Sequence, residues 1–278
     1  MEIYYLGTGA AEGWPALFCT CENCERARIK KGKNYRSRQQ VLIDNRLLMD
    51  FGPDTFYHMM KYDLDMSKVE QVLLTHSHTD HFYSTELILR AKPYAFDREK
   101  NRMTLYGNEK CHWMFLNTLQ VEDDSVNMKE CVKFEEIHAF QNFDIPGYKI
   151  KPLRAIHDPK EECLIFLIEN QEGKTFLYAN DTAYFPEETW KALEGIKLDC
   201  VSLDCTLGKS SILKASHMGL AANYLVMKRL KEMKCVDEKT KVILTHFSHN
   251  GGLLHEELEK EVEKEGYIIA YDGMKIFF

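Results

Sequence analysis

The segment His76-Ser77-His78-Thr79-Asp80-His81 places three imidazoles and one carboxylate within six residues. Neutral imidazole and carboxylate are ligands that zinc, manganese and iron take, and one metal ion rarely takes four ligands from so short a stretch. Positions 76 and 78 can point one way, while 80 and 81 turn towards a neighbouring position. The pattern therefore predicts two metal ions side by side. The alternative is a histidine-rich loop that binds nothing.

The residues around this motif indicate how it is held. Val69–Thr75 (VEQVLLT) has the apolar character of a buried strand, and the segment from Phe82 through Arg90 has the character of a helix. The motif is therefore expected on a loop from a strand to a helix. Functional groups commonly gather on such loops because the flanking elements form a rigid scaffold.

The composition is that of an ordinary globular protein. Of 278 residues, 45% are hydrophobic and 28% are charged, which allows one large domain or two small ones. The formal net charge of −7 argues against a general nucleic-acid binder but leaves a local basic patch open. Nine cysteines and an N-terminus without signal-peptide character favour the cytoplasm, where clustered thiols more often bind metal. No apolar stretch approaches the roughly 18 residues of a membrane span, so no membrane partner is expected.

Strand-like and helix-like segments alternate along the chain, without a linker rich in Ser, Pro or Gly. We expect strands at 1–6, 40–43, 46–50, 69–75, 103–106, 164–169, 175–178, 200–204 and 241–244, further strands up to 156, and helices at 55–62, 82–90, 109–119 and about 218–232. An acidic loop is expected after 119. The pattern favours one α/β domain over residues 1–278, with two sheets covered by helices.

Three later residues share one position, at the end of an apolar strand. His157 follows PLRAI, Asp181 follows TFLYAN, and His246 follows VILT. Strand ends that converge on one rim are where α/β folds place their sites. Each residue alone is as well explained as a cap or turn residue. Together with the primary motif they form a candidate set of metal ligands.

The order GTGAAEG, LLMDFGPD, THSHTDH, AIH, YANDT and ILTH resembles the motif pattern of the metallo-β-lactamase superfamily over nearly the whole chain. The resemblance implies an α/β fold, the four-layer αββα metallo-β-lactamase sandwich, with two divalent ions (zinc or manganese, with iron or nickel as further options). The implied ligands are His76, His78 and His157 for one ion, Asp80, His81 and His246 for the other, and Asp181 between them. Asp80 would thereby serve catalysis as well. Asp50 would hold a ligand imidazole through its other ring nitrogen, and Asp204 is a further candidate for that role or a turn cap.

A second cluster, Cys19-Thr20-Cys21-Glu22-Asn23-Cys24, holds three thiols in six residues. Three thiolates can converge on one tetrahedral zinc ion, but a structural zinc site needs a fourth ligand. His249 is the candidate, because it follows His246 by three residues on the same expected loop. A redox pair of Cys21 and Cys24, or free thiols, are the alternatives. The segment at about 19–38 is therefore expected to be a structural zinc insertion.

The combination of CTCENCERAR, THFSH and AYDGM resembles more narrowly the phosphoribosyl cyclic phosphodiesterases of the carbon–phosphorus lyase pathway and their relatives. That resemblance implies structural zinc held by Cys19, Cys21, Cys24 and His249. It also implies a general acid before a helix, at His217 in KASHMGL. The alternative for His217 is a helix cap.

These observations predict a dinuclear metal-dependent phosphodiesterase acting on a small sugar phosphate diester, either cyclic or linear. A tRNA-processing endonuclease of the same superfamily and a non-hydrolytic cofactor-biosynthesis protein are the alternatives. The expected partner is a small phosphate ester rather than nucleic acid, and a homodimer is one option. The basic run from Arg26 to Arg38 is expected to be a solvated face, with the binding of a second phosphate or an RNA backbone as its alternative.

Overall fold

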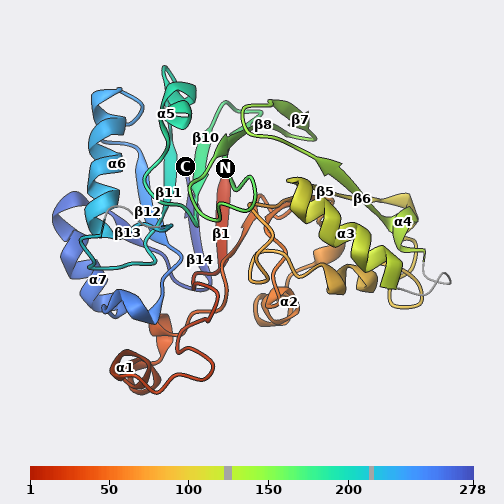
Figure 1. Ribbon diagram of the computed structural model, residues 1–278, viewed down its shortest axis with the longest axis horizontal. Helices are drawn as coiled ribbons and strands as arrows, with labels where there is room; N and C mark the ends of the chain where they lie inside the picture. Colours follow the sequence, from red (N-terminus) through yellow and green to blue (C-terminus); the bar gives the residue numbers. More distant parts are fainter. Residues whose placement is uncertain (122–126, 213–215) are drawn as a thin grey trace.

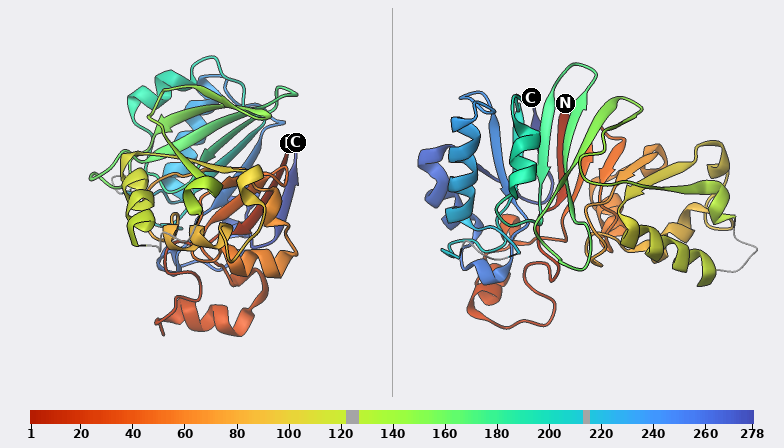
Figure 2. Two further views of the ribbon diagram at one scale, coloured as in Figure 1. Left: turned by 90° about the vertical axis from the view of Figure 1, so that its right-hand side faces the viewer. Right: turned by 45° about the horizontal axis from the view of Figure 1, so that its top comes forward.

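The computed structural model describes residues 1–121, 127–212 and 216–278. Two seven-stranded sheets face each other, and helices cover their outer faces (Figures 1 and 2). The two termini lie side by side, with the Met1 amino group donating a hydrogen bond to the Phe278 carbonyl at 2.9 Å. The predicted four-layer αββα sandwich is thus confirmed.

The predicted strands lie in the predicted order. The helices at 22–30, 128–131, 187–193 and 255–262 and the strands at 268–269 and 274–277 were not predicted. The strands are β1 (Glu2–Gly7), β2 (Gln40–Ile43), β3 (Leu47–Met49), β4 (Gln71–Leu73), β5 (Met103–Gly107), β6 (Val132–Glu136), β7 (Phe143–Ile145), β8 (Tyr148–Arg154), β9 (Leu164–Asn170), β10 (Thr175–Ala179), β11 (Cys200–Asp204), β12 (Lys241–Thr245), β13 (Ile268–Ile269) and β14 (Met274–Phe277). The α-helices are α1 (Glu22–Lys30), α2 (Thr55–Tyr62), α3 (Glu109–Val121), α4 (Met128–Cys131), α5 (Glu187–Leu193), α6 (Leu220–Glu232) and α7 (His255–Val262). Short 3₁₀ helices are η1 (Gly32–Asn34), η2 (Met66–Lys68), η3 (Ser84–Arg90), η4 (Arg98–Lys100), η5 (His249–Gly251) and η6 (Glu263–Glu265).

Each sheet is part antiparallel and part parallel. The first has the order β14-β1-β2-β3-β4-β5-β6, and its pairs from β3 to β6 are parallel. The second has the order β13-β12-β11-β10-β9-β8-β7, and its pairs from β10 to β13 are parallel. Parallel neighbours end at the same edge, so the loops after them are brought together there.

Alternation along the strands distributes the core over three layers. In β1, Ile3 and Tyr5 face the other sheet, whereas Tyr4 and Leu6 face the helices of their own side. The middle layer is filled from both sheets. One outer layer lies under α5, α6 and α7 and contains Trp190, and the other lies under α3 and η3. Strands that are buried on both faces read as continuous apolar runs, which explains sequences such as VILT.

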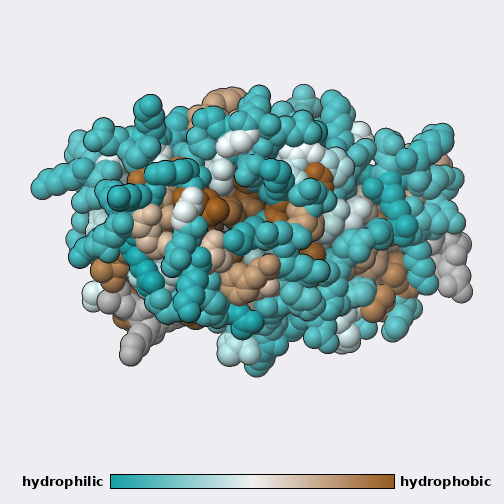
Figure 3. All heavy atoms as spheres, turned by 90° about the horizontal axis from the view of Figure 1, so that it is seen from above, coloured by the Kyte–Doolittle hydropathy of each residue, from teal (hydrophilic) through white to brown (hydrophobic). Residues whose placement is uncertain are grey.

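The face seen from above in Figure 3 is mainly hydrophilic. Seen from above, teal side chains cover most of this face, and apolar atoms show mainly towards its middle (Figure 3). None of the described helices is long and apolar enough to cross a membrane.

One predicted element differs in kind. The segment expected as an α-helix over 82–90 is the 3₁₀ helix η3, Ser84–Arg90. Phe82 is buried and forms a β-bridge with Phe51, and the Tyr83 N–H donates to the Phe51 carbonyl. These contacts fix the backbone directly before η3. The β-branched residues Thr85 and Ile88 also favour the α-helix less. Part of the acidic loop expected after 119 lies at 122–126, outside the described residues.

Candidate metal centre

The predicted metal ligands meet at one edge of the sandwich because each follows the end of a strand. The six-residue motif follows β4, His157 follows β8, Asp181 follows β10, and His246 follows β12. Two sets of ligand atoms result, each within 4.8 Å of one another. They are His76, His78, His157 and Asp181 in one set, and Asp80, His81, His246 and Asp181 in the other.

Asp181 belongs to both sets and lies at the centre of the cluster. Its carboxylate oxygens approach ring nitrogens of five imidazoles, which are His217 (2.9 Å), His81 (3.0 Å), His157 (3.2 Å), His76 (3.3 Å) and His246 (3.6 Å). The sequence-based placement of Asp181 between two ions remains a prediction, and this position suits it.

Three residues of the site have a left-handed backbone conformation, which amino acids other than glycine seldom adopt. The φ angles are 64° at Asp50, 57° at Asp181 and 59° at His246. Among the residues other than glycine, aspartate and histidine occur there more often than most. Such backbone strain is typically found at functional sites, where surrounding contacts hold it in place.

Each imidazole of the two sets has a hydrogen-bond partner on one ring nitrogen. The pairs are Thr75 Oγ1 with His76 Nδ1 (3.0 Å), Asp50 Oδ2 with His81 Nδ1 (2.8 Å), Thr206 Oγ1 with His246 Nδ1 (2.7 Å), the Ser216 carbonyl with His157 Nδ1 (3.2 Å), and Asp158 Oδ2 with His78 Nε2 (3.3 Å). One nitrogen of each ring is thus held by the protein, and the other is left for a ligand role. Metal-binding histidines are commonly fixed in this way.

Sequence reasoning named Asp50 among these partners but missed Asp158 and the buried Glu161 beyond it. Glu161 accepts hydrogen bonds from the Ser77 backbone N–H (2.9 Å) and the Ser77 hydroxyl (2.6 Å), so it fixes the motif loop. It also accepts from Asn108 Nδ2 at 2.7 Å. The segment HDPKEE after β8 was the available signal, because its carboxylates follow a predicted ligand directly.

His217 lies beside the cluster and pairs with Asp204. The His217 Nδ1 atom is 2.9 Å from Asp204 Oδ2, and Asp204 also accepts from the backbone N–H groups of Thr182 (3.1 Å) and Thr206 (2.7 Å). Burial alone would lower the pKa of His217, but the carboxylates of Asp204 and Asp181 outweigh burial and raise it to about 11. Asp204 therefore acts both as a turn cap and as the partner of His217, rather than of a metal-ligand imidazole.

Burial and neighbouring charges shift the pKa values of the imidazoles and carboxylates in the cluster. Burial lowers the pKa of His76 well below its usual value. At His81 the carboxylates of Asp80 and Asp50 outweigh burial and raise the pKa. Burial would raise the pKa of Asp181, but the surrounding imidazoles, His246 first, hold it well below its usual value.

Two buried atoms at the centre show that these residues fit metal ions. Among the described residues, His76 Nε2 and Asp181 Oδ1 have no hydrogen-bond partner, although imidazoles approach closely. A buried polar atom without a partner is costly, and a bound cation would satisfy both. Nitrogen and carboxylate donors suit zinc, manganese or iron. The donor set and its geometry thus match a pair of divalent ions.

The cysteine cluster forms a separate candidate site around α1, which lies below the sheets in Figure 1. The sulfur atoms of Cys19, Cys21 and Cys24 and a ring nitrogen of His249 lie within 4.8 Å of one another. His249 Nδ1 is 3.2 Å from Cys21 Sγ and 3.8 Å from Cys19 Sγ. The backbone N–H of Cys24 lowers the pKa of Cys21 to about 6, which favours the thiolate that zinc needs.

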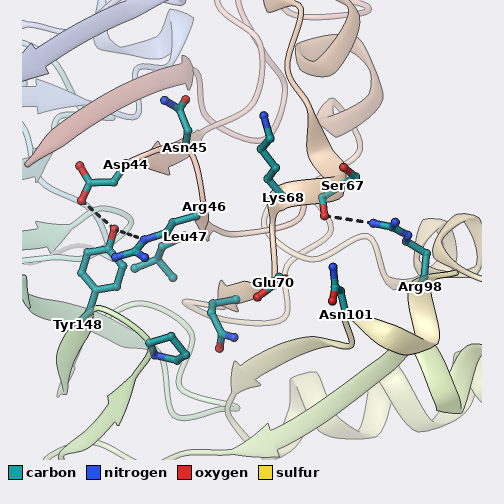
Figure 4. Close-up of a pocket in the computed structure, with 12 residues that line it drawn as sticks. Asp44, Asn45, Arg46, Leu47, Ser67, Lys68, Glu70, Arg98, Asn101 and Tyr148 are labelled. Carbon is teal, nitrogen blue, oxygen red and sulfur yellow. Dashed lines mark hydrogen bonds between the residues drawn. The ribbon is translucent and has the colours of Figure 1, made fainter.

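A cavity of about 490 Å³ opens beside the metal motif, with His78 and Asp80 on its wall. Another, of about 500 Å³, lies at the opposite ends of the strands, where Arg46, Lys68 and Arg98 line it (Figure 4). The residues that line this second cavity include none of the predicted ligands. The cavity beside the motif is therefore the one that adjoins the candidate metal centre.

The basic residues between Arg26 and Arg38 lie in different environments and do not form one exposed face. Arg26 and Lys33 pair with Glu257 and Glu259 of α7, and Arg36 is buried, with its Nη1 donating to the Ala270 carbonyl at 2.6 Å. The prediction of one solvated face is thus wrong for Arg36, because that guanidinium fills a polar gap in the interior. Arg38 lines the cavity beside the motif.

Comparison with known proteins places this geometry in a family. The family model of the beta-lactamase superfamily domain matches residues 45–247. Coenzyme PQQ synthesis protein B of Acinetobacter baumannii is 22% identical in an alignment of 316 positions that covers 99% of this chain and 99% of that protein. Ribonuclease Z of Listeria monocytogenes is 26% identical over 140 residues, which cover 49% of this chain but only 39% of that protein. The crystal structure of a diphosphatase from the PhnP family covers 100% of this chain and 97% of its own, with a TM-score of 0.75 and 23% identity, and this likeness shows the fold alone.

Proposed function

The chain belongs to the beta-lactamase superfamily, and we propose that it is a metal-dependent phosphodiesterase that hydrolyses a small sugar phosphate diester, cyclic or linear. The observation that carries the proposal is the complete pair of ligand sets joined by Asp181, with His217 beside them. Many members of this superfamily are metal-dependent hydrolases. The solved structure from the PhnP family, named a diphosphatase, shares the fold, so a phosphoryl compound is the substrate class to test first.

The proposed ligands would hold two divalent ions, which when bound supply Lewis acidity towards water and a phosphoryl oxygen. The protein itself fixes the ligand rings, because Thr75, Asp50 and Thr206 hold their Nδ1 atoms. The same partners fix which ring nitrogen carries the proton. The site thus requires little rearrangement around a substrate.

His217 is proposed as the general acid. Asp204 holds its Nδ1, so Nε2 is the atom that can give a proton to the leaving alkoxide. A well-placed general acid contributes about 10²–10⁴-fold to the rate. His217→Ala should therefore lower kcat for an alkoxide leaving group far more than for 4-nitrophenolate, which needs no proton to leave.

The test is hydrolysis by the protein loaded with Mn²⁺ or Zn²⁺. Bis(4-nitrophenyl) phosphate and cyclic ribose phosphates should be cleaved, and Asp181→Ala should remove the activity. Failure to cleave any diester, with active-site metal present by elemental analysis, would refute the proposal.

A second candidate is a non-hydrolytic role in cofactor synthesis, favoured by the full-length likeness to coenzyme PQQ synthesis protein B. Zinc bound only at the cysteine cluster, with the dinuclear site unable to take up metal, would support it. A tRNA-processing endonuclease is a weaker alternative, because the sequence likeness to ribonuclease Z covers only half of the chain. A gel shift with a precursor tRNA would distinguish it.

A further inference from the structure

We propose that Arg38 and Lys110 form a subsite for a second anionic group of the substrate, outside the bond that is hydrolysed. This inference rests on the proposed function. The cavity of about 490 Å³ beside the metal motif is lined by Ala11, Arg38, Pro53, Ser77, His78, Thr79, Asp80, Lys110 and Met114. Apart from residues of the motif, Arg38 and Lys110 are its charged lining residues.

Arg38 lines this cavity, and its guanidinium is held by two protein acceptors. Its Nη1 donates to Asp54 Oδ1 at 3.1 Å, and its Nε donates to the Ala11 carbonyl at 3.1 Å. The segment before Asp54 packs tightly on the motif, because a Cβ at Gly52 would lie 2.1 Å from the Asp80 carbonyl oxygen. The guanidinium is thus fixed relative to the metal motif.

Lys110 also lines the cavity and pairs with two carboxylates. Its Nζ is 3.4 Å from Glu161 Oε1 and 3.8 Å from Asp158 Oδ2. Asp158 in turn holds His78 Nε2 at 3.3 Å. Lys110 is therefore two contacts from a predicted metal ligand, and its ammonium is anchored by carboxylates that also position the motif loop.

Both cations keep hydrogen-bonding capacity for a ligand. Among the described residues, Arg38 Nη2 has no protein partner, and an ammonium has three N–H donors. The Arg38 and Lys110 side chains are 29% and 39% exposed, so a substrate can reach them. Because their positions are set by ion pairs, little conformational entropy remains to be lost on binding. Charge-assisted hydrogen bonds to phosphate or carboxylate are the strong ones, so the subsite favours an anionic substituent.

The experiment compares two substrates that differ by one phosphate. These are thymidine 5′-(4-nitrophenyl phosphate) and the same compound carrying a 3′-phosphate, hydrolysed by the metal-loaded full chain. The readout is the ratio of their kcat/KM values, because partial misfolding or loss of metal cancels in a ratio. The variants are Lys110→Met, Arg38→Met and Arg38→Lys, with Lys149→Met as the control. Lys149 is an exposed lysine paired with Glu169 at 3.0 Å and absent from the cavity lining.

We expect the wild type to favour the 3′-phosphorylated substrate by about tenfold or more, and Lys110→Met and Arg38→Met each to lower that ratio by about tenfold. Arg38→Lys should retain part of the preference, and Lys149→Met all of it. A wild-type ratio within about twofold of one, or the same ratio in all variants, overturns the subsite while leaving the phosphodiesterase intact. An equal loss in Lys149→Met would show a general effect of charge and also overturn it. If neither substrate is cleaved, the proposed function itself fails and the subsite with it.

Discussion

Replacing Asp50 by asparagine should weaken metal binding without removing any metal ligand. Asp50 is fully buried, and its Oδ2 is 2.8 Å from His81 Nδ1. Its Oδ1 accepts from the Thr75 backbone N–H at 2.8 Å and from the Thr75 hydroxyl at 2.9 Å. An asparagine has one oxygen and one NH₂ group in these places. Whichever way the amide turns, one buried N–H group meets another donor.

An unpaired buried donor costs about 1–3 kcal/mol, which corresponds to about 5–150-fold in affinity for the metal that His81 is proposed to bind. The assay is a competition titration of the metal-free protein with Zn²⁺ against a chromogenic chelator. Asp199→Asn is the matched control, because Asp199 accepts from Lys174 Nζ (2.7 Å) and the Thr175 N–H (2.9 Å) away from the site. A Zn²⁺ affinity of Asp50→Asn within twofold of the wild type would refute the orienting role of Asp50.

Three further predictions concern the backbone, pH and the zinc cluster. In Gly52→Ala the new methyl group would lie 2.1 Å from the Asp80 carbonyl oxygen, so the motif loop must move. Urea unfolding should show that the free energy of unfolding falls by about 1–3 kcal/mol, and metal binding should weaken. An unchanged stability and metal affinity would contradict this packing. Burial lowers the pKa of His58 to about 4, from 6.5 when the ring is exposed. As the pH falls from 7 to 4, the ring therefore takes up a proton in the unfolded chain before it does so in the folded chain. Over that range the wild type should lose about 3 kcal/mol of stability relative to His58→Gln. A difference between these two proteins that does not change with pH would contradict that ionisation. Cys24→Ser should lower the zinc content of the cysteine cluster and also weaken active-site metal binding, because His249 and His246 share one loop. Loss of that zinc with an unchanged metal affinity of the active site would show that the two sites are independent.

The fold and the convergence of the candidate ligands were predictable because both depend on local patterns. Buried strands are visible as apolar runs. The polar residues that follow them, such as His157, Asp181 and His246, gather because β8, β10 and β12 run in the same direction and end at one edge of the sheet. The motif at 76–81 needs no tertiary information, since its donors are adjacent in the chain. The sequence therefore indicates which residues meet, but not how each ring is oriented.

What the sequence could not show depends on contacts between distant loops. Thr206 contacts the ring of His246, and its sequence context does not distinguish it from a turn residue. The pairing of Asp204 with His217 likewise requires the loop after β11 to pass beside the start of α6. The burial of Arg36 within a basic run is a further case, because charge patterns predict solvent exposure.

We propose that Asp181 would be a shared ligand of two metal ions, at a site apart from the zinc of the cysteine cluster. The most direct test is the number of metal ions per chain, measured by elemental analysis after loading with Zn²⁺ and removal of the excess. Three ions in the wild type, falling towards one in Asp181→Ala, are the predicted result. One ion per chain in both proteins would contradict the dinuclear site.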